Sequence, residues 1–514
     1  MEEKHQLVQV RLEKLEKLKE MGVNPYPYSF KVTDHNKDLV RSFEEQENRK
    51  KADLFGEPEN PEDGRRFGIA GRIMSFRSMG KASFAHINDG SGQIQIYLRK
   101  DQLGEEAYNV VKLLDLGDII GVKGYLFRTR TGEITLGVES FELLAKSVRP
   151  LPVVKEKVVD NEKMVYDKVE DKEFRYRQRY VDLVVNPEVR EIFLARARLI
   201  NRIRAFLDEL DFLEVETPVL QPIYGGAAAR PFTTYHNALE RKLYLRISNE
   251  LYLKRLVVGG FNRVYEFSKD FRNEGIDRSH NPEFTMLEFY QAYADYYEMM
   301  DLVEKLVYDA ITGSLGQEHS QLEWRGKKID LKLPWPRRSM LDLLSEAAGD
   351  EIALPLDREQ LAGLCRKYEI EVTPAMGAGK LLDELFGELL EPNLHDPTFV
   401  TDYPIETSPL AKRHRDNPEL VERFELLIGG MEIANAFSEL NDPLDQRQRF
   451  QAQMKLRDAG DEEAQVMDED YLRAMEYGLP PTGGVGIGID RLAMLVTGSD
   501  TIKDVILFPQ LRPE

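Results

Sequence analysis

The sequence predicts a multidomain α/β protein in which a small closed β-barrel precedes a larger α/β domain. The chain has 514 residues, enough for two or more domains with substantial cores. Short strand signals separated by turns crowd residues 65–150, whereas helical and strand patterns are mixed from about residue 186 to the end. These two stretches define the predicted domains.

Composition is that of a soluble globular protein. Hydrophobic residues make up 42% and charged residues 31% of the chain, and no apolar run approaches the length that spans a bilayer. The charged, helix-periodic N-terminus differs from a signal peptide, so we expect a cytoplasmic protein with no membrane partner. Cys365 is the single cysteine, which excludes an intramolecular disulfide and a multi-cysteine metal site. The net charge of -20 disfavours a sequence-independent nucleic-acid binder, because phosphate contacts need basic surface.

Residues 1–64 are predicted to form a helix followed by a connector. Apolar residues at helical spacing run from Leu7 to Leu18, and Gly22 with Pro25 ends the helix. Such a helix packs on the fold or joins subunits. Residues 30–64 are polar and rich in turn and charge clusters, so they are interpreted as a connector.

Residues 65–150 are predicted to form the barrel. Strand signals are separated by turns such as 89–92 and 131–132, with one helical interruption near residues 102–114. Several short strands with one helix favour an OB-fold. Pro150 and Pro152 end this unit, and the charged segment 151–185 is interpreted as a linker.

Residues 186–514 are predicted to form the large α/β domain. Val189–Leu210 has helical periodicity, and an apolar strand broken by Pro218 follows it. Residues from about 310 to 400 are mixed and mostly helical, and we interpret them as an insertion.

The most informative segment of this domain is FRNEGIDRSHNPEFTMLEFY, residues 271–290. Apolar and polar residues alternate before residue 272, and the alternation resumes after the turn-forming stretch 275–282. Two strands joined by a polar loop are therefore predicted. Their shared face carries an arginine, carboxylates, an aromatic ring and a phenol, which suits a ligand with anionic, aromatic and cationic parts.

This string resembles motif two of the class II aminoacyl-tRNA synthetases in the form found in lysyl-tRNA synthetases. GGVGIGIDRLAML around Arg491 resembles motif three, the helix and strand ending at Pro218 resemble motif one, and RISNELYLKR and GGAAARPFTT match the same family. The resemblance implies an OB-fold anticodon-binding domain and a catalytic domain built on an antiparallel sheet with flanking helices. It also implies a homodimer joined through the motif-one helix and strand, with ATP, L-lysine and tRNA(Lys) as substrates.

The resemblance implies five ATP-binding residues, which are Arg272, Glu274, His280, Phe284 and Arg491. Arg272 and Arg491 would be catalytic, since an arginine fork holds a carboxylate and a phosphate oxygen together. Phe284 and Arg491 would enclose adenine, and Glu274 would accept from its amino group. The family often has an arginine directly before the histidine, but here Arg278 lies one residue earlier. Which of Arg278 and His280 meets the outer phosphates is left open.

A magnesium site is predicted at a second hairpin. Gly429 and Gly430 form a two-residue turn, which places Glu425 diagonal to Glu432 on one face. Diagonal positions lie roughly 7–8 Å apart, so the two carboxylates can share a cation. Magnesium prefers oxygen ligands and substrate phosphates, and the resemblance makes both glutamates its ligands. We expect no zinc.

The resemblance also implies the lysine-binding residues, listed here: Gly226, Glu250, Arg272, Glu288, Tyr290, Asn435, Phe437 and Glu439. Several carboxylates suit a substrate with two ammonium groups. Glu439 and Tyr290 are assigned to the ε-ammonium, and Glu288 with the backbone near Gly226 to the α-ammonium. Glu250 fits either. By strict alternation Glu432 lies on the opposite face from Asn435, so either a bulge intervenes or one assignment is wrong.

In the barrel the resemblance assigns Phe84, Gln95 and Glu133 to the anticodon; an ordinary core position is the alternative for Phe84. Rival functions are an aspartyl- or asparaginyl-type synthetase, a non-catalytic RNA-binding paralogue and an enzyme that transfers lysine to protein. The acidic pocket disfavours an aspartyl- or asparaginyl-type synthetase. The intact motif arginines and glutamates disfavour a non-catalytic paralogue, and the intact barrel disfavours an enzyme that transfers lysine to protein.

Overall fold

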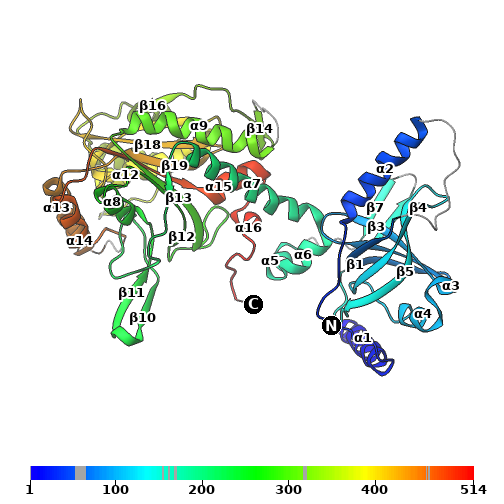
Figure 1. Ribbon diagram of the computed structural model, residues 1–514. Helices are drawn as coiled ribbons and strands as arrows, with labels where there is room; N and C mark the ends of the chain where they lie inside the picture. Colours follow the sequence, from blue (N-terminus) through cyan, green and yellow to red (C-terminus); the bar gives the residue numbers. More distant parts are fainter. Residues whose placement is uncertain are drawn as a thin grey trace. The chain divides into compact units, whose positions relative to one another are not determined.

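The computed structural model describes residues 2–52, 65–152, 155–159, 162–166, 171–315, 321–374, 376–458, 460 and 463–513. The chain divides into two compact units, residues 1–169 and 170–514. Each unit is described by itself (Figure 1).

The first unit is built on a closed five-stranded barrel with the strand order β1-β2-β3-β5-β4. Its strands are β1 (Phe67–Ser78), β2 (Ala82–Asn88), β3 (Gln93–Arg99), β4 (Ile119–Arg128) and β5 (Ile134–Ala145). Inward-facing aliphatic side chains such as Ile69, Ile96 and Val122 are fully buried. The short helices α3 (Lys100–Leu103) and α4 (Glu105–Val111) lie where the helical interruption was predicted. The OB-fold prediction is confirmed.

Among its described side chains, helix α1 (Glu2–Glu20) packs through those of its second half. Leu18 is fully buried, whereas Leu7 and Val10 are 50% and 47% exposed. The predicted apolar stripe therefore meets the fold at one end.

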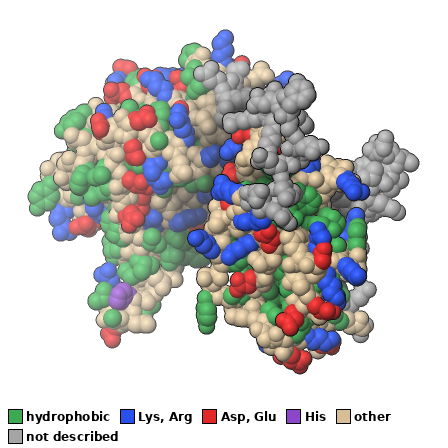
Figure 2. Space-filling model, turned by 45° about the vertical axis from the view of Figure 1, so that its right-hand side comes forward, with side chains coloured by type: hydrophobic (Ala, Val, Ile, Leu, Met, Phe, Trp, Pro, Cys, Tyr) green, Lys and Arg blue, Asp and Glu red, His purple; other side chains and the backbone are tan. Residues whose placement is uncertain are grey.

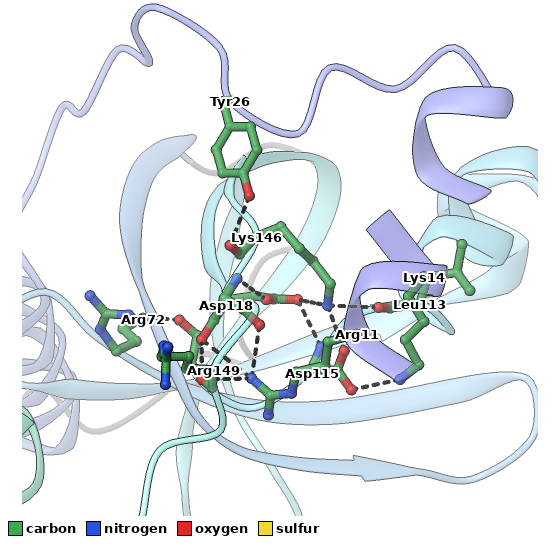
Figure 3. Close-up of polar contacts among 11 residues, drawn as sticks. Arg11, Lys14, Tyr26, Arg72, Leu113, Asp115, Asp118, Lys146 and Arg149 are labelled. Atoms are coloured by element: carbon green, nitrogen blue, oxygen red, sulfur yellow. Dashed lines mark hydrogen bonds and ion pairs between the residues drawn. The ribbon is translucent and has the colours of Figure 1, made fainter. Parts of the chain in front are cut away.

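Charged residues fasten α1 to the barrel (Figure 3). Arg11 Nη1 donates to the carbonyl oxygen of Ser147 at 2.9 Å, and Lys14 pairs with Asp115 at 2.6 Å. Lys146, whose side chain is fully buried, pairs with Asp115 at 2.5 Å and with the equally buried Asp118 at 2.8 Å. Because the charges are paired, burying them here is tolerated.

Two predicted connecting segments contain regular structure. The connector at 30–64 includes helix α2 (Asn36–Ala52), which its polar sequence did not predict. The linker at 151–185 includes the hairpin β6 (Lys155–Val159) and β7 (Glu162–Tyr166), and helices α5 (Lys172–Arg177) and α6 (Arg179–Val185). Residues 53–64, 153–154, 160–161 and 167–170 of these segments lie outside the described residues.

The second unit is built on an eight-stranded sheet with the order β16-β17-β18-β19-β20-β13-β12-β8. Its strands are β8 (Leu213–Glu214), β12 (Arg263–Phe271), β13 (Glu283–Ala292), β16 (Arg337–Ser339), β17 (Thr398–Pro404), β18 (Leu420–Ile428), β19 (Met431–Ser438) and β20 (Thr482–Gly488). The six central strands are antiparallel, as the resemblance implied. The edge strands β8 and β16 run parallel to their neighbours, so the sheet is mixed.

Three helices cover one face of this sheet (Figure 1). These are α7 (Pro187–Glu209), α9 (Tyr296–Leu315) and α15 (Ile489–Thr497). They share a core with inward residues of β13 and β20, such as Leu287, Phe289 and Ile487. The alternate residues of the same strands point to the opposite face, where the predicted site residues lie.

The remaining elements surround this layer. The helices are α8 (Glu250–Val258), α10 (Met340–Ala348), α11 (Arg358–Lys367), α12 (Ala378–Leu389), α13 (Pro443–Asp458), α14 (Glu469–Glu476) and α16 (Ile502–Val505), and the smaller strands are β9 (Leu220–Gln221), β10 (Thr233–His236), β11 (Arg241–Leu245), β14 (Gln321–Trp324) and β15 (Lys327–Asp330). Helices α10, α11 and α12 of the predicted insertion form a separate apolar cluster. Among the described helices, none has the length and apolar content to cross a bilayer.

Candidate active site

The hairpin of β12 and β13 positions the predicted nucleotide residues. Asp270 pairs with Phe284 across the hairpin, and Arg272 follows the end of β12. The guanidinium of Arg272 lies 5.1 Å from the centre of the Phe284 ring, and its buried Nε has no hydrogen-bond partner among the described residues. An arginine with an unused buried donor is prepared to bind an anion. Glu274, further along the loop, is exposed.

A second arginine approaches the same face from α15. Arg491 lies in the first turn of that helix and donates through Nη1 to Glu432, at 2.9 Å to the carbonyl oxygen and 3.1 Å to Oε2. Its Nη2 lies 3.4 Å from His280 Nε2, and His280 Nδ1 lies 2.8 Å from Asp277. The carbonyl oxygen of Arg278 accepts from Ile502 at 2.8 Å. His280 is therefore the member of the predicted pair that lies beside Arg491.

A β-bulge brings Glu425 and Glu432 onto one face. Leu426 pairs with Ala434 but Leu427 pairs with Glu432, so Ile433 is the extra residue in β19. The bulge resolves the alternation conflict raised by the sequence, because it restores Glu432 to the face of Glu425.

The two carboxylates differ in their surroundings. Burial, and next the nearby charge of Glu432, raises the pKa of Glu425 to about 7. Arg423 Nη2 lies 2.6 Å from Glu425 Oε1 and partly offsets this. Among the described residues no group of three or more His, Cys, Asp or Glu forms a metal cluster, so any cation here would take its further ligands from substrate or water.

The predicted amino-acid pocket begins on β13. Glu288 Oε1 accepts from Ser248 Oγ at 2.9 Å, and Glu288 Oε2 accepts from the Tyr290 hydroxyl at 3.1 Å. Burial, and next the charges of Asp270 and Glu250, raises the pKa of Glu288 to about 8. A buried carboxyl group close to other acidic groups holds its proton more tightly, and a cation beside it would favour its ionised form.

Gly226 lies against the start of α8. Its φ of +89° belongs to the left-handed region, and a Cβ there would lie 2.7 Å from Ser248 Oγ and 3.1 Å from Glu250 Cβ. Only glycine therefore fits beside the pocket. The Glu250 backbone N–H also donates to Ser248 Oγ at 3.1 Å.

Glu439 lies on the chain just beyond β19 and is almost fully buried. A Cβ added to Gly484 of the adjacent strand would overlap Glu439 Oε1 and the Tyr290 ring. Glycine at this position thus leaves the space that the carboxylate and the phenol share. Phe437 and Asn435 precede Glu439 on the same strand, and Asn435 Oδ1 accepts from Arg423 Nε at 3.1 Å.

Sequence reasoning missed several residues that contact the predicted ones. Lys254 of α8 is fully buried and its ammonium contacts the carboxylates of both Glu250 and Glu439. Its i+4 spacing from Glu250 on a helix was a usable signal. Ser248 and Arg423 were also missed, because their contacts with Glu288 and Asn435 join segments far apart in the sequence or on different strands.

In the barrel, Phe84 lies on the outer face. It stacks on Tyr97 with ring centres 4.3 Å apart and an interplanar angle of 17°. The core alternative for Phe84 is therefore wrong, since Ser83 and Ala85 occupy the inward positions. Gln95 Nε2 donates to Glu133 Oε2 at 2.6 Å, so these two predicted residues lie together. Tyr97 was missed, although the alternation in GQIQIYL puts it on the face of Gln95.

Comparisons with known proteins agree with this arrangement. Residues 171–512 match the family model of tRNA synthetases class II (D, K and N), and residues 68–144 match that of the OB-fold nucleic acid binding domain. A lysine--tRNA ligase of Carboxydothermus hydrogenoformans is 53% identical over 100% of this chain and 99% of that protein. Proteins of the same name are 52% identical in Porphyromonas gingivalis, over 98% of this chain and 85% of theirs, and in Pelotomaculum thermopropionicum, over 100% and 96%. The two motif arginines, the acidic pocket and these full-length matches have one explanation: the chain belongs to the class II lysyl-tRNA synthetases.

Proposed function

We propose that this protein activates L-lysine with ATP and transfers the lysyl group to tRNA(Lys). The observation that carries the proposal is a buried cluster of the carboxyl groups of Glu250, Glu288 and Glu439, with Arg272 just past the end of β12, the strand that pairs with the strand of Glu288. Two ammonium groups and a carboxylate are what lysine would present to such a pocket. Aspartate would meet like charge there, which disfavours an aspartyl- or asparaginyl-type activity.

The reaction joins the lysine carboxylate to the α-phosphorus of ATP and expels pyrophosphate. Arg272 would hold the attacking carboxylate and an α-phosphate oxygen, which places the two reactants together and offsets the charge that develops on phosphorus. Its free Nε supports this role. Phe284 would stack on adenine, Arg491 would cover the other side, and Glu274 would accept from the adenine amino group.

His280 is our choice over Arg278 for the outer phosphates. It lies 3.4 Å from Arg491, so both side chains would meet the same end of the nucleotide. The Asp277 carboxylate would accept from Nδ1 and orient the ring, which leaves Nε2 facing the phosphates.

Glu425 and Glu432 would hold magnesium. Their position on one face suits a pair of oxygen ligands, and the raised pKa of Glu425, caused first by burial and then by Glu432, shows that two acidic groups are close together there. A magnesium ion there would neutralise phosphate charge during activation. Arg491 contacts Glu432 and would exchange that contact for phosphate.

The barrel unit would bind the anticodon. Phe84 offers an aromatic plane on the outer face, and Gln95 and Glu133 offer hydrogen-bonding groups beside it. An aromatic side chain on an OB strand can stack an unpaired base.

The second unit would form the homodimer through its motif-one region. Leu213, Val219, Leu220 and Ile223 are 46%, 38%, 49% and 38% exposed along β8 and β9. Apolar side chains also gather at the base of the projecting β10–β11 hairpin (Figure 2). An exposed apolar patch of this kind is typical of a protein interface.

ATP–pyrophosphate exchange with each of the twenty amino acids tests the function. We expect exchange with lysine and at least about 100-fold less with any other, because a pocket built for a charged group rejects analogues that lack it. Exchange driven by aspartate or asparagine, or by no amino acid, would contradict the proposal. In a magnesium titration of the same assay, Glu432→Gln should need more magnesium than the parent; an unchanged midpoint would remove that residue from the metal site.

A further inference from the structure

The Lys254 ammonium is an internal cation inside the predicted substrate pocket. Its side chain is fully buried and contacts the carboxylates of Glu250, one turn earlier on α8, and of Glu439 beyond β19. It also lies 5.4 Å from the centre of the Phe437 ring. Lys254 thus contacts three residues that sequence analysis assigned to the substrate.

Resting on the proposed function, we infer that Lys254 is a specificity-determining residue, which keeps Glu439 ionised so that this carboxylate demands a cation from the substrate. It acts through Glu439 and Glu250 rather than by touching the reacting atoms. It is therefore a positioning residue for the substrate ammonium.

One carboxylate oxygen of Glu439 faces away from Lys254. Oε2 is the atom that the Lys254 ammonium approaches, whereas Oε1 is turned toward Gly484 and Tyr290. Oε1 has no hydrogen-bond partner among the described residues. Buried carboxylate oxygens in a purely structural ion pair are normally satisfied, because an orphaned acceptor is costly. Oε1 is positioned to accept from an incoming ammonium.

The charges of this cluster suit a substrate with two ammonium groups. Glu250, Glu288 and Glu439 provide three carboxyl groups, and the Lys254 ammonium contacts two of them. Once a bound cation ionises Glu288, whose pKa is raised to about 8, two net negative charges face the α- and ε-ammonium groups of lysine. The substrate carboxylate would then be left to Arg272.

Burial opposes the ionisation of Glu439. It raises the pKa of this group well above its ordinary value, and the carboxylates of Glu250 and Glu288 act in the same direction. Lys254 opposes them, and its own pKa is raised by Glu250 and Glu439. The hydroxyls of Tyr290 on β13 and Tyr471 on α14 also face this site, and Lys412, Arg413, Arg415, Asp295 and Glu422 line a cavity together with Glu439.

Without the ammonium, the two acids would take up protons, because two buried carboxylates close together cannot both stay ionised. A neutral acid accepts only a weaker hydrogen bond from an ammonium. The pocket would therefore lose its preference for a substrate side chain that carries a positive charge.

Lys254→Met tests the inference, because methionine keeps the length and apolar character of the stem. The measurement is the ratio of kcat/KM for lysine and norleucine in ATP–pyrophosphate exchange from pH 6.5 to pH 9. Both amino acids carry the α-ammonium, so titration at Glu288 cancels in the ratio. We expect the ratio at neutral pH to fall by about tenfold or more, and to recover as the pH rises and Glu439 ionises. Lys328→Met, on the exposed face of β15, is the matched control and should keep the parent ratio.

A Lys254→Met enzyme with the parent ratio at every pH would overturn the inference. The parent enzyme gives a test that does not depend on the variant folding: its ratio should stay flat over the same range. A parent ratio that falls with decreasing pH as one carboxyl titrates would show that Lys254 does not hold Glu439 ionised. A parent that activates no lysine would instead refute the proposed function.

Discussion

The pocket glutamates differ in what neutralises them before substrate arrives. Glu250 and Glu439 share the ammonium of Lys254, whereas Glu288 accepts only from the neutral hydroxyls of Ser248 and Tyr290 among its described hydrogen bonds. The pKa of Glu288 is accordingly raised to about 8, first by burial and then by Asp270 and Glu250. Glu288 is therefore the group whose ionisation should follow the arrival of a cation.

At neutral pH, lysine binding should be linked to proton release at Glu288. The KM for lysine is expected to fall as the pH rises toward about 8, because the α-ammonium prefers the ionised carboxylate. Glu288→Gln should remove this pH dependence and weaken lysine binding by about 1.5–3 kcal/mol, the usual worth of a hydrogen bond to a charged group. Initial rates of exchange over a pH series measure both effects. A parent KM that is flat between pH 6 and pH 8.5 would contradict the role.

The same substitution should stabilise the empty enzyme. The native carboxyl keeps its proton to about pH 8, whereas an unfolded glutamate loses it near 4.5. Native stability is thus greatest below the lower value and is lost as the pH rises through the upper one. Thermal unfolding at pH 8.5 should show a higher Tm for Glu288→Gln than for the parent, while Glu323→Gln, on the exposed face of β14, should show none of this gain.

The residues within the motif strings could be predicted from the sequence, whereas the charged residues that contact them could not. Glu288, Tyr290 and Glu439 could be assigned because each lies in a recognisable string. The contact of Lys254 with both Glu250 and Glu439 could not be predicted, because it depends on α8 packing against the end of β19.

At the scale of elements, strands predicted by alternation were found, and irregular segments were predicted less well. The two-residue turn at Gly429–Gly430 and the hairpin of β12 and β13 follow from local sequence, since turn residues and period-two patterns are local signals. Helix α2 was missed because its sequence is highly polar and shows no apolar stripe that would indicate a helix. The edge strand β8 lies within the strand predicted before Pro218 but is only two residues long. The other edge strand, β16, has three residues, too few for periodicity to reveal.

The outer face of β2 and β3 supports a prediction about RNA binding. Phe84→Ala should raise the KM for tRNA by the equivalent of ~1–3 kcal/mol, the usual worth of stacking one base. ATP–pyrophosphate exchange needs no tRNA and should stay within about twofold of the parent value, because stacking on tRNA is absent from that assay. Aminoacylation and exchange assays on the same preparation make the comparison. Equal losses in both would mean that Phe84 supports the fold through Tyr97 rather than binding RNA.

At the scale of the whole molecule, the motif-one surface should govern assembly. Leu220→Asp is expected to convert a dimer into monomers, because a stable interface buries upwards of roughly 1,000 Å² and does not tolerate an unpaired charge in its apolar part. Leu220 and Leu456 of α13 are both 49% exposed, so Leu456→Asp is a matched control. Light scattering after size-exclusion chromatography reads the mass directly. A monomeric parent, or a dimeric Leu220→Asp protein, would contradict the dimer proposal.

The order of domains along the chain could be read from the sequence because each has its own pattern, short strands in one and longer mixed elements in the other. The attachment of α1 to the barrel could not. Its contacts join Arg11 and Lys14 to residues about one hundred or more positions away, and charge composition carries no information about such pairs.

The extra residue at Ile433 makes the stretch from Gly430 to Glu439 a segment of fixed length. Deleting one residue between Glu432 and Ala434 would return Glu432 to the covered face of the sheet, while a second insertion would do the same from the other side. A substitution in this stretch changes one side chain. A change in length moves every side chain before or after the altered position to the opposite face of the sheet. Over the course of divergence, this hairpin should therefore accept replacements while insertions and deletions are confined to the loops outside it.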